Sequence, residues 1–418
     1  MKHKLGSLVE EAMVRLTGVV PRTPLEFNPY LSRLYGADVL FKREDRGLGR
    51  SFKSRGSFNR ISLLDSGERH RGVVCASAGN HAQGVALSCQ RLEIKGWIYM
   101  PKNTSPQKIA RVKDLGGKWV SLVLVGETYD EACVHARAFT TRTNKVFIHP
   151  FDDLNVIAGQ GTVALEILEQ LPAGHRLDFL LTTVGGGGLI AGTGGYLESR
   201  SPKTKLIGVE PSGAPSMSRA LAAGKVVTLE KMDTFVGGAA VRTVGALTFE
   251  IARPLISQVV LVDEGRVCQE MVRLHQQEGI VTEPAGALTV AALEQIKSRI
   301  RGKTVVCVIS GGNQDINQWP EITRRSLVYQ GLRQYFIIEL SQRPGELKAY
   351  LNKVLQRDDD ITLLRYQKHD DQGSGLVLIA VDLGDKKELG SLLRHMSKMG
   401  LTYEHLTGNS RMFRLLVS

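Results

Sequence analysis

The stretch FLLTTVGGGGLI occupies residues 179–190 and joins an apolar run to four consecutive glycines. We expect residues 179–184 to form a buried β-strand, because they are apolar or β-branched throughout. Helical periodicity begins near Ile190, so the glycines lie between a strand and a helix. Without side chains, this loop can turn several backbone N–H groups toward one anion at the positive end of the helix. The stretch predicts a site for a phosphate monoester, with a flexible turn as the competing interpretation.

Outward from this stretch, short β-branched runs alternate with longer segments of helical periodicity, from about residue 39 to residue 312. Such alternation is typical of an α/β fold, in which helices cover a largely parallel sheet. In open sheets of this kind, ligands bind outside the carboxyl ends of the strands. The candidate strands are residues 39–42, 72–76, 96–100, 119–125, 146–149, 179–184, 205–210, 259–262 and 304–309.

The pattern changes after residue 322. We expect a strand at 335–340, a helix to about residue 355, strands at 361–367 and 376–383, a helix at 386–399 and a last strand at 401–406. This βαββαβ order is the split βαβ arrangement, and a segment of ~90 residues can fold as its own domain. We therefore predict a second domain at residues 334–408, with 318–333 as the connection.

Length and composition exclude several broad classes of protein. A chain of 418 residues exceeds what one hydrophobic core usually supports, so we expect at least two compact units. No apolar run reaches the ~20 residues that span a bilayer. Residues 1–8 lack the apolar segment of a secretory signal. These features favour a cytoplasmic protein with no membrane partner.

Neither the charge nor the cysteines indicate a nucleic-acid, disulfide-rich or zinc-binding protein. The formal charge is +12, but the Lys and Arg residues are dispersed and do not alternate with aromatic residues in one stripe. The charge therefore favours solubility and a mild attraction of anionic ligands, with no nucleic-acid partner. The cysteines are odd in number and form no CxxC pair, so we interpret them as buried thiols. They are Cys75, Cys89, Cys133, Cys268 and Cys307.

The segment SFKSRG, residues 51–56, contains a lysine in an unusual context. A lone lysine is usually a solvated surface residue. Here Phe52 is apolar, and Arg50 and Arg55 lie close to Lys53 in sequence. Apolar surroundings and nearby cations both lower the pKa of an amine and make it nucleophilic toward a carbonyl. Lys53 is therefore the candidate catalytic residue.

The segment SAGNH, residues 77–81, follows the predicted strand 72–76 and precedes a helix. Its hydroxyl, amide and backbone donors at a helix N-terminus could bind a carboxylate, and Asn80 could donate to a phenolic oxygen. A plain helix cap with a glycine at the helix entry is the alternative interpretation.

The segment SGGN, residues 310–313, follows the predicted strand 304–309. A serine at the end of a strand can simply cap a turn. Its place at the same edge of the sheet as the other three motifs makes Ser310 a further candidate for ligand binding.

Together, SFKSRG, SAGNHAQG, VGGGGL, TEPAGAL and SGGN resemble, in order and spacing, the fold-type II pyridoxal-phosphate enzymes. Within them the chain is most similar to the biosynthetic threonine dehydratases, also called threonine deaminases or threonine ammonia-lyases, over essentially its whole length. The resemblance implies a two-lobed catalytic domain similar to tryptophan synthase β. We expect it at residues 1–325, with a small lobe at about 40–150 inserted in the large lobe.

The resemblance also implies a role for each motif residue. Lys53 would hold pyridoxal 5'-phosphate as a Schiff base, Asn80 would bind its 3-hydroxyl, and Ser310 would face its pyridine nitrogen. A hydroxyl partner does not keep that nitrogen protonated, which weakens the ring as an electron sink. The substrate carboxylate would lie at Ser77, Asn80 and His81. The phosphate would be bound by Gly185, Gly186, Gly187, Gly188 and Leu189.

The reaction implied is the conversion of L-threonine to 2-oxobutanoate and ammonia, the first committed step toward isoleucine. Lys53 would remove the Cα proton, the β-hydroxyl would leave, and the released enamine would hydrolyse. A serine dehydratase or a broader hydroxy-amino-acid dehydratase is an alternative, because one methyl group is worth only ~1–3 kcal/mol of discrimination. A catalytically inert amino-acid sensor is the alternative from another class of function.

Some positions depart from related enzymes. Serine racemases have a second serine where this chain has Ala78, so racemisation is not expected here. Relatives that bind a divalent cation use the segment that matches Glu210, Ala214 and Ser216, where this chain has a serine in place of a carboxylate. We therefore assign no metal ligand, and whether a cation binds near Glu210 and Ala214 stays an open question at this point. Cysteine-synthase-like relatives have a different lysine motif and a TSGN loop.

The C-terminal βαββαβ segment, with RPGEL at residues 343–347, resembles a single ACT-like regulatory domain. In the family such domains bind isoleucine or valine and shift a two-state equilibrium, and we expect feedback regulation of an allosteric homo-oligomer, a dimer or a tetramer. A module that serves only dimerisation is the competing interpretation.

Overall fold

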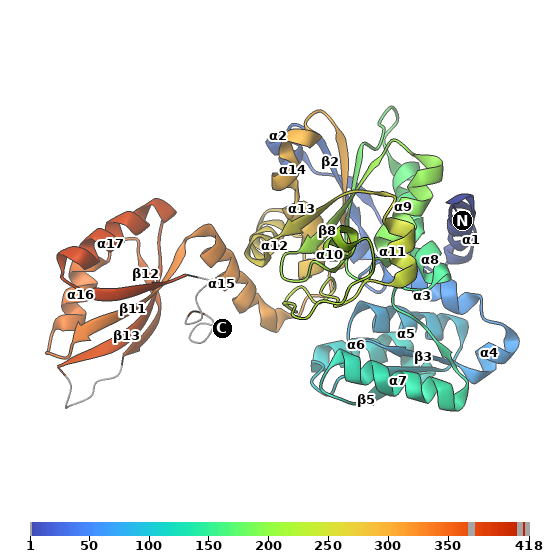
Figure 1. Cartoon of the computed structure of the whole chain (residues 1–418), viewed down its shortest axis with the longest axis horizontal. Coiled ribbons are helices and arrows are strands. Elements are labelled where there is room, and N and C mark those ends of the chain that lie inside the picture. The colour runs from blue at the N-terminus through green and yellow to red at the C-terminus, as the bar shows by residue number, and fades with distance from the viewer. Residues whose placement is uncertain (1, 367–372, 408–412, 414–418) are drawn as a thin grey trace. The chain divides into compact units, whose positions relative to one another are not determined.

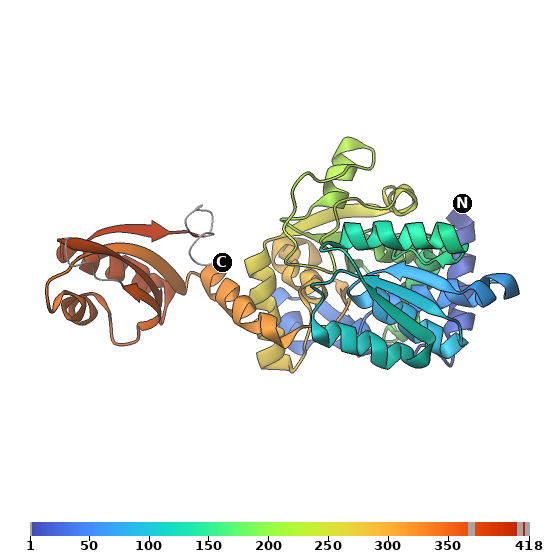
Figure 2. The same cartoon turned by 90° about the horizontal axis from the view of Figure 1, so that it is seen from below.

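The computed structural model describes residues 2–366, 373–407 and 413, and it separates into two compact units (Figures 1 and 2). The first unit is Met1–Ile316 and the second is Asn317–Ser418. Across the described ranges, no helix is both long enough and apolar enough to cross a membrane.

The first unit is built on a six-stranded sheet in the order β1-β2-β10-β7-β8-β9. All neighbours in it are parallel except β1, which pairs antiparallel with β2. The parallel α/β fold is confirmed. The edge strand β1 was not predicted, because three residues are too short to show a period. The strands are β1 (Leu25–Phe27), β2 (Asp38–Arg43), β7 (Phe179–Thr183), β8 (Lys205–Pro211), β9 (Ile256–Val262) and β10 (Thr304–Ile309).

Helices α8 and α9 cover one face of this sheet, and α13 covers the other. Helices α1 and α3 pack on α8, and α12 and α14 pack beside α13. One apolar cluster joins the sheet to α1, α8 and α9. The helices are α1 (Lys2–Leu16), α2 (Pro29–Tyr35), α3 (Lys53–Ser62), α4 (Ser66–Arg71), α8 (Leu154–Gln170), α9 (Gly188–Arg200), α10 (Ser216–Ala223), α11 (Ala246–Ala252), α12 (Glu264–Glu278), α13 (Pro284–Ala291) and α14 (Leu293–Ile300), with the 3-10 turn η1 (Glu44–Arg46).

Glycines allow α3, α8 and α9 to touch through their backbones. A Cβ added at Gly159 of α8 would lie 2.6 Å from the Cα of Gly56 in α3, and one added at Gly192 of α9 would lie 2.2 Å from the carbonyl oxygen of Ile157 in α8. Real Cβ atoms do not approach other atoms so closely, so neither crossing has room for a side chain. These crossings account for part of the glycine excess.

A second sheet, in the order β5-β4-β3-β6, is parallel throughout. Alternate residues of β3 face opposite sides, with Val73 and Cys75 toward α5 and α6, and Val74 and Ala76 toward α7. The elements are β3 (Val73–Ala76), β4 (Gly96–Met100), β5 (Val120–Leu124), β6 (Val146–Phe147), α5 (Asn80–Leu92), α6 (Pro106–Gly116), α7 (Tyr129–Thr143) and the 3-10 turn η2 (Gly117–Trp119).

The small lobe differs at its start from the expected residues 40–150. Strand β2 belongs to the six-stranded sheet, where it pairs with β10 from Thr304↔Asp38 to Ile309↔Arg43. Its fully apolar centre fits the interior of either sheet, so the sequence alone did not assign it.

The second unit has the expected βαββαβ order and an antiparallel sheet ordered β12-β13-β11-β14. The expected connection at 318–333 contains a helix, α15. Gln367, the predicted end of one strand, and residue 408, the predicted end of the domain, lie outside the described residues. The elements are η3 (Ile316–Gln318), α15 (Trp319–Gln330), β11 (Arg333–Ser341), α16 (Glu346–Val354), β12 (Asp360–Tyr366), β13 (Ser374–Asp382), η4 (Lys386–Glu388), α17 (Leu389–Lys398) and β14 (Thr402–Leu406).

Candidate active site

The structure brings the lysine loop and the SGGN loop together. Ser51 forms a β-bridge with Gly311, and the backbone N–H of Phe52 donates to the carbonyl of Ser310 at 3.2 Å. Arg50, just before the bridge, has a left-handed backbone (φ 49°) although it is not a glycine. Such conformations cost energy and cluster at functional sites. Lys53 begins α3 directly after this strained turn.

Lys53 is half-buried, and within the part of the chain that the structure describes no carboxylate contacts its amine. Its Nζ donates to the carbonyl of Pro150 at 2.8 Å and lies 5.2 Å from the ring centre of Phe52. Burial lowers the pKa of Lys53 to about 8, although the carboxylate of Glu283 acts in the opposite direction. A neutral amine is therefore accessible near physiological pH, which is the property that nucleophilic and general-base lysines require.

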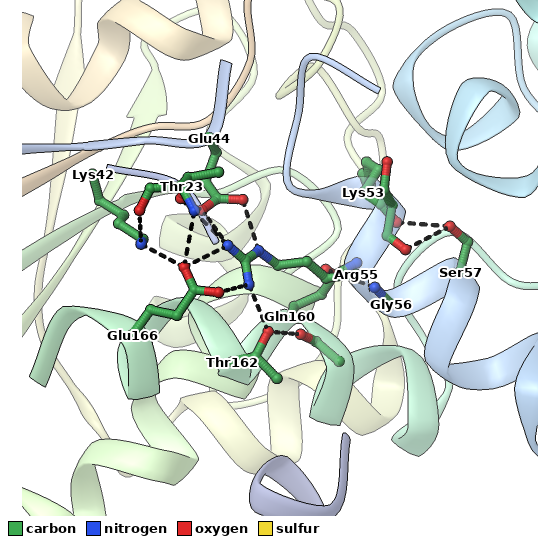
Figure 3. Close-up of polar contacts among 12 residues, drawn as sticks. Thr23, Lys42, Glu44, Lys53, Arg55, Gly56, Ser57, Gln160, Thr162 and Glu166 are labelled. Carbon is green, nitrogen blue, oxygen red and sulfur yellow. Dashed lines mark hydrogen bonds and ion pairs between the residues drawn. The ribbon is translucent and has the colours of Figure 1, made fainter. Parts of the chain in front are cut away.

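A buried group of four charges lies two residues beyond Lys53 (Figure 3). Arg55 donates to both oxygens of Glu44, with its Nε–Oε2 distance at 2.8 Å, and to both oxygens of Glu166 at 2.7 and 2.8 Å. Lys42 also contacts Glu166, at 2.6 Å. We call these four residues the Arg55 network. Its formal charges sum to zero, and all four side chains are at most 2% exposed.

The electrostatics of the Arg55 network favour the ionised forms of Arg55 and Glu166. Burial alone would lower the pKa of Arg55, but Glu44 and Glu166 hold it above its ordinary value. Burial alone would raise the pKa of Glu166, but Arg55 and Lys42 hold it below. Because Glu44 lies in η1 and Glu166 in α8, the network joins the start of α3 to two other elements. It therefore fixes the backbone that carries Lys53.

The tetraglycine loop has the backbone groups that an anion needs. The N–H groups of Gly188, Leu189 and Ile190 form the first turn of α9, and the first intrahelical bond runs from Ala191 to Gly187. Gly187 has a φ of 93°, a conformation that favours glycine. The loop is thus a helix N-terminus whose first N–H groups have no acceptor within the helix, which is the arrangement that a phosphate would need.

The glycines also make room for a neighbouring aromatic ring. A Cβ added at Gly186 would lie 2.2 Å from the ring of Phe151, and one at Gly188 would lie 3.1 Å from the Cβ of the same residue. Phe151 directly follows Pro150, the acceptor of the Lys53 amine. One short segment therefore lies between the lysine and the glycine loop.

Ser310 is buried at the end of β10, and its Oγ donates to the carbonyl of Ala285 at 3.1 Å. Thr183 donates to the same carbonyl at 2.7 Å. Because Thr183 already satisfies Ala285, the hydroxyl proton of Ser310 can turn to another acceptor without leaving a buried carbonyl unpaired. A pyridine nitrogen is an acceptor of that kind.

The SAGNH loop lies at the start of α5 and is half-buried up to Asn80. A Cβ added at Gly79 would meet no atom within 4 Å, so this glycine faces open space. Ser77 accepts from the N–H of Gly79 at 3.1 Å. The first N–H groups of α5 have no acceptor within the helix, and they suit a carboxylate.

The imidazole of His81 has a different position from the one that the sequence suggested. Its Nε2 contacts the carbonyl of Ile148 at 2.9 Å, and the ring is buried. Burial, together with the charge of Lys53, lowers the pKa of His81 to about 3. The ring is therefore neutral, and what His81 can offer a carboxylate is its backbone N–H.

Sequence reasoning assigned no role to two polar residues of this site, Glu283 and Asn313. Asn80 donates to Glu283 at 2.6 Å and accepts from Asn313 at 2.7 Å. A single acid in the otherwise uncharged segment VTEPAGAL, residues 281–288, was the signal that could have identified Glu283.

The carboxylate of Glu210 is used as a helix cap. It accepts from the backbone N–H groups of Met217 at 2.7 Å and Ser218 at 2.9 Å, at the start of α10. Burial raises the pKa of Glu210 to about 7, while these two N–H groups oppose the rise. Ala214 and Ser216 are buried close by. Among the residues that the structure describes, no group of three His, Cys, Asp or Glu could hold a metal.

These residues fit the cofactor that the sequence resemblance implies. The amine of Lys53, with its lowered pKa, matches an aldehyde. The N-terminus of α9 at the tetraglycine loop matches a phosphate, and the buried hydroxyl of Ser310 matches a ring nitrogen. The loops that carry them follow β2, β3, β7 and β10, at the carboxyl ends of parallel strands.

Two family models match the chain. Residues 16–311 match the model described as "Pyridoxal-phosphate dependent enzyme", and residues 324–416 match "C-terminal regulatory domain of Threonine dehydratase". The two matches correspond closely to the two compact units.

Curated relatives and solved structures agree with these family models. The biosynthetic L-threonine dehydratase of Lactococcus lactis is 48% identical over 98% of this chain and 99% of its own length. That of Halalkalibacterium halodurans is 47% identical over 96% of each chain. The processed form of threonine deaminase isoform 2 from Solanum lycopersicum has a TM-score of 0.74 at 38% identity, covering 78% of this chain and 94% of that one. Maize serine racemase has a TM-score of 0.71 at 30% identity, covering 77% and 98%.

Replacement of Arg55 by Leu is expected to lower the free energy of unfolding by about 3–5 kcal/mol, because it leaves two carboxylates buried without their main cation. Chemical denaturation followed by circular dichroism measures this change. The control is Arg46→Ala, which removes an exposed ion pair with Glu26 and should cost about 0–1 kcal/mol. Equal losses for the two variants would contradict a structural role for the Arg55 network.

The reactivity of Lys53 should rise with pH through about 8, because only the neutral amine is nucleophilic. The lowered pKa means that the neutral amine forms at a lower pH than in a free lysine, whose pKa is 10.5. Trace acetylation of the cofactor-free protein at a series of pH values, with peptides quantified by mass spectrometry, measures the profile. A free lysine derivative in the same tube is the reference. A Lys53 profile that coincides with the reference would show that burial does not perturb the amine.

Proposed function

The chain belongs to the pyridoxal-phosphate-dependent enzymes, within the family of threonine dehydratases, and from this premise we propose that Lys53 carries its reaction. The enzyme uses pyridoxal phosphate to convert L-threonine to 2-oxobutanoate and ammonia, the first committed step toward isoleucine. The observation that supports Lys53 is its amine, whose pKa burial lowers to about 8 and which donates to the carbonyl of Pro150. Residues 1–325 would form the catalytic domain.

We assign the cofactor contacts to three loops. The N–H groups from Gly185 to Leu189 would hold the phosphate, Asn80 would face the phenolic oxygen, and Ser310 would face the ring nitrogen. When bound, pyridoxal phosphate supplies an electron sink for the charge that develops at the substrate Cα. Ser310 would donate a hydrogen bond from its hydroxyl to the ring nitrogen, and it bears no charge of its own. This weak electronic support favours rapid loss of a β-leaving group.

Lys53 would move the proton. Its amine, once free of the cofactor, can take the Cα proton because its pKa lies near physiological pH. The carbonyl of Pro150, which accepts from Nζ at 2.8 Å, holds the amine on the side of the small lobe. The hydroxyl of Ser77 and the first N–H groups of α5 would orient the substrate carboxylate, which keeps the Cα–H bond directed at the amine.

The same loop bears on the choice between dehydration and racemisation. Ala78 stands where serine racemases have the second serine that acts on the face opposite the lysine, and alanine has no hydroxyl to serve there. Racemisation needs proton transfer on both faces, whereas elimination needs removal of the Cα proton on one face. The loop therefore supports elimination, although the fold also resembles a serine racemase.

We propose that the second unit regulates the first. It matches the regulatory domain of threonine dehydratase and has the βαββαβ order expected of an ACT-like domain at residues 334–408. Isoleucine or valine is the proposed effector, and a dimer or tetramer is the proposed assembly, because regulation by small domains commonly acts across symmetric interfaces.

Replacement of Lys53 by Ala should reduce 2-oxobutanoate formation from L-threonine by several orders of magnitude, since both the covalent anchor and the base are lost. The measurement is steady-state turnover with added pyridoxal phosphate, on L-threonine and on L-serine. Lys303→Ala, an exposed lysine at the opposite end of β10, is the matched control and should keep full activity. Full turnover by Lys53→Ala would disprove the assignment, and a higher kcat/KM for serine would redefine the substrate.

Isoleucine should inhibit the full-length enzyme, and its apparent affinity should fall as the threonine concentration rises, because an inhibitor favours the less active state. Inhibition curves at several threonine concentrations measure this coupling. D-isoleucine, with the same composition and opposite chirality, is the control. Indifference to both isoleucine and valine would leave the second unit a role in assembly alone.

A further inference from the structure

The side-chain amide of Asn80 is held at both ends by residues from two other loops. Its Nδ2 donates to Oε1 of Glu283 at 2.6 Å, and its Oδ1 accepts from Nδ2 of Asn313 at 2.7 Å. Asn313 in turn donates to the carbonyl of Gly49 at 2.9 Å, four residues before Lys53. We call this series of hydrogen bonds, which links Gly49, Asn313, Asn80 and Glu283, the amide relay.

Only one orientation of each amide satisfies the relay. The carbonyl of Gly49 can only accept, so Asn313 must turn its Nδ2 toward it. That nitrogen then donates to Asn80, which must present its oxygen. At the other end an ionised Glu283 also only accepts, so Asn80 must present its nitrogen. A flip of Asn80 would set oxygen against carboxylate and nitrogen against nitrogen, and would lose both bonds.

The surrounding backbone is shaped around this contact. A Cβ added at Gly311 would lie 2.4 Å from Oε1 of Glu283 and 3.2 Å from Nδ2 of Asn80. The backbone N–H of Glu283 donates to the carbonyl of Gly311 at 3.2 Å. The second residue of the SGGN motif is therefore a glycine because the carboxylate and the amide meet directly beside it.

Glu283 has a raised pKa, because the groups that favour its ionised, accepting form offset only part of the effect of burial. Burial raises the pKa of Glu283, and the hydrogen bond from Asn80 and the cations of Lys108, Lys53 and Arg50 oppose the rise. With one N–H of Nδ2 used by Glu283, Asn80 keeps its second N–H for a ligand.

We propose that Glu283 and Asn313 are positioning residues that fix the amide of Asn80 with its Nδ2 toward the phenolic oxygen of the cofactor. This inference rests on the proposed function, which places that oxygen at Asn80. The two residues act through Asn80 and bring the lysine loop, the SAGNH loop, the SGGN loop and the TEPAGAL segment into one hydrogen-bonded unit.

A double-mutant cycle on cofactor affinity tests the relay. Asn80→Ala and Glu283→Ala should each weaken binding of pyridoxal phosphate to the cofactor-free protein by about tenfold, as loss of one buried hydrogen bond predicts. The double variant should bind no more weakly than Asn80→Ala, because Glu283 has no effect once Asn80 is gone. Absorbance titration gives the affinities, and the position of the absorbance band reports contact with the phenolic oxygen.

Conservative replacement separates orientation from charge. Glu283→Gln keeps an oxygen that accepts from Asn80, so its affinity should stay within about threefold of wild type, as expected when a hydrogen bond is kept. Glu294→Gln, on the exposed side of α14, controls for loss of one negative charge. If Glu283→Ala does not fold, as judged by thermal unfolding, Asn313→Ala with Asn80→Ala gives the same cycle from the other side.

Additive losses in the cycle would overturn the proposal, because Glu283 would then act independently of Asn80. So would a Glu283→Gln variant as weak as Glu283→Ala, which would show that charge matters and orientation does not. A wild-type protein that fails to bind pyridoxal phosphate at all would refute the proposed function itself, which keeps the two failures distinguishable.

Discussion

The structure of the site depends on the buried Arg55 network, which joins the helix of Lys53 to η1 and α8. Two acids and two bases share an interior from which water is excluded, so removal of any one leaves an uncompensated charge. Replacement by apolar residues of similar volume can match such a network in stability, so stability alone does not explain it. Hydrogen bonds and ion pairs are directional, so the Arg55 network permits only one arrangement of its side chains. That arrangement holds the first turn of α3 in place.

Much of the fold and part of the site could be predicted from the sequence, because those signals are local. The tetraglycine run, the lysine in SFKSRG and the polar loops each follow a strand closely, and parallel sheets gather such loops at one edge. The βαββαβ order of the second unit was likewise visible in the spacing of its apolar runs. The family resemblance added the cofactor and the reaction, which no single motif specifies.

What the sequence did not show depends on contacts between distant segments. Glu283 and Asn80 are separated by 203 positions, and no pattern near either residue predicts their hydrogen bond. The imidazole of His81 contacts the carbonyl of Ile148 just after β6, although the SAGNH motif suggested that His81 binds the substrate carboxylate. Strand β2 belongs to the large sheet, where it pairs with β10 along its full length. Long-range pairing decided each of these outcomes.

The glycine crossings of α3, α8 and α9 have a consequence for the evolutionary history of such a chain. At Gly159 and Gly192, an added side chain would meet backbone atoms of the neighbouring helix and not a side chain that a second substitution could shorten. No second substitution restores the fit, so a compensating pair of mutations cannot replace these glycines. The spacing of the three helices is therefore fixed by backbone contact, and a substitution at Gly159 or Gly192 would have to move a whole helix.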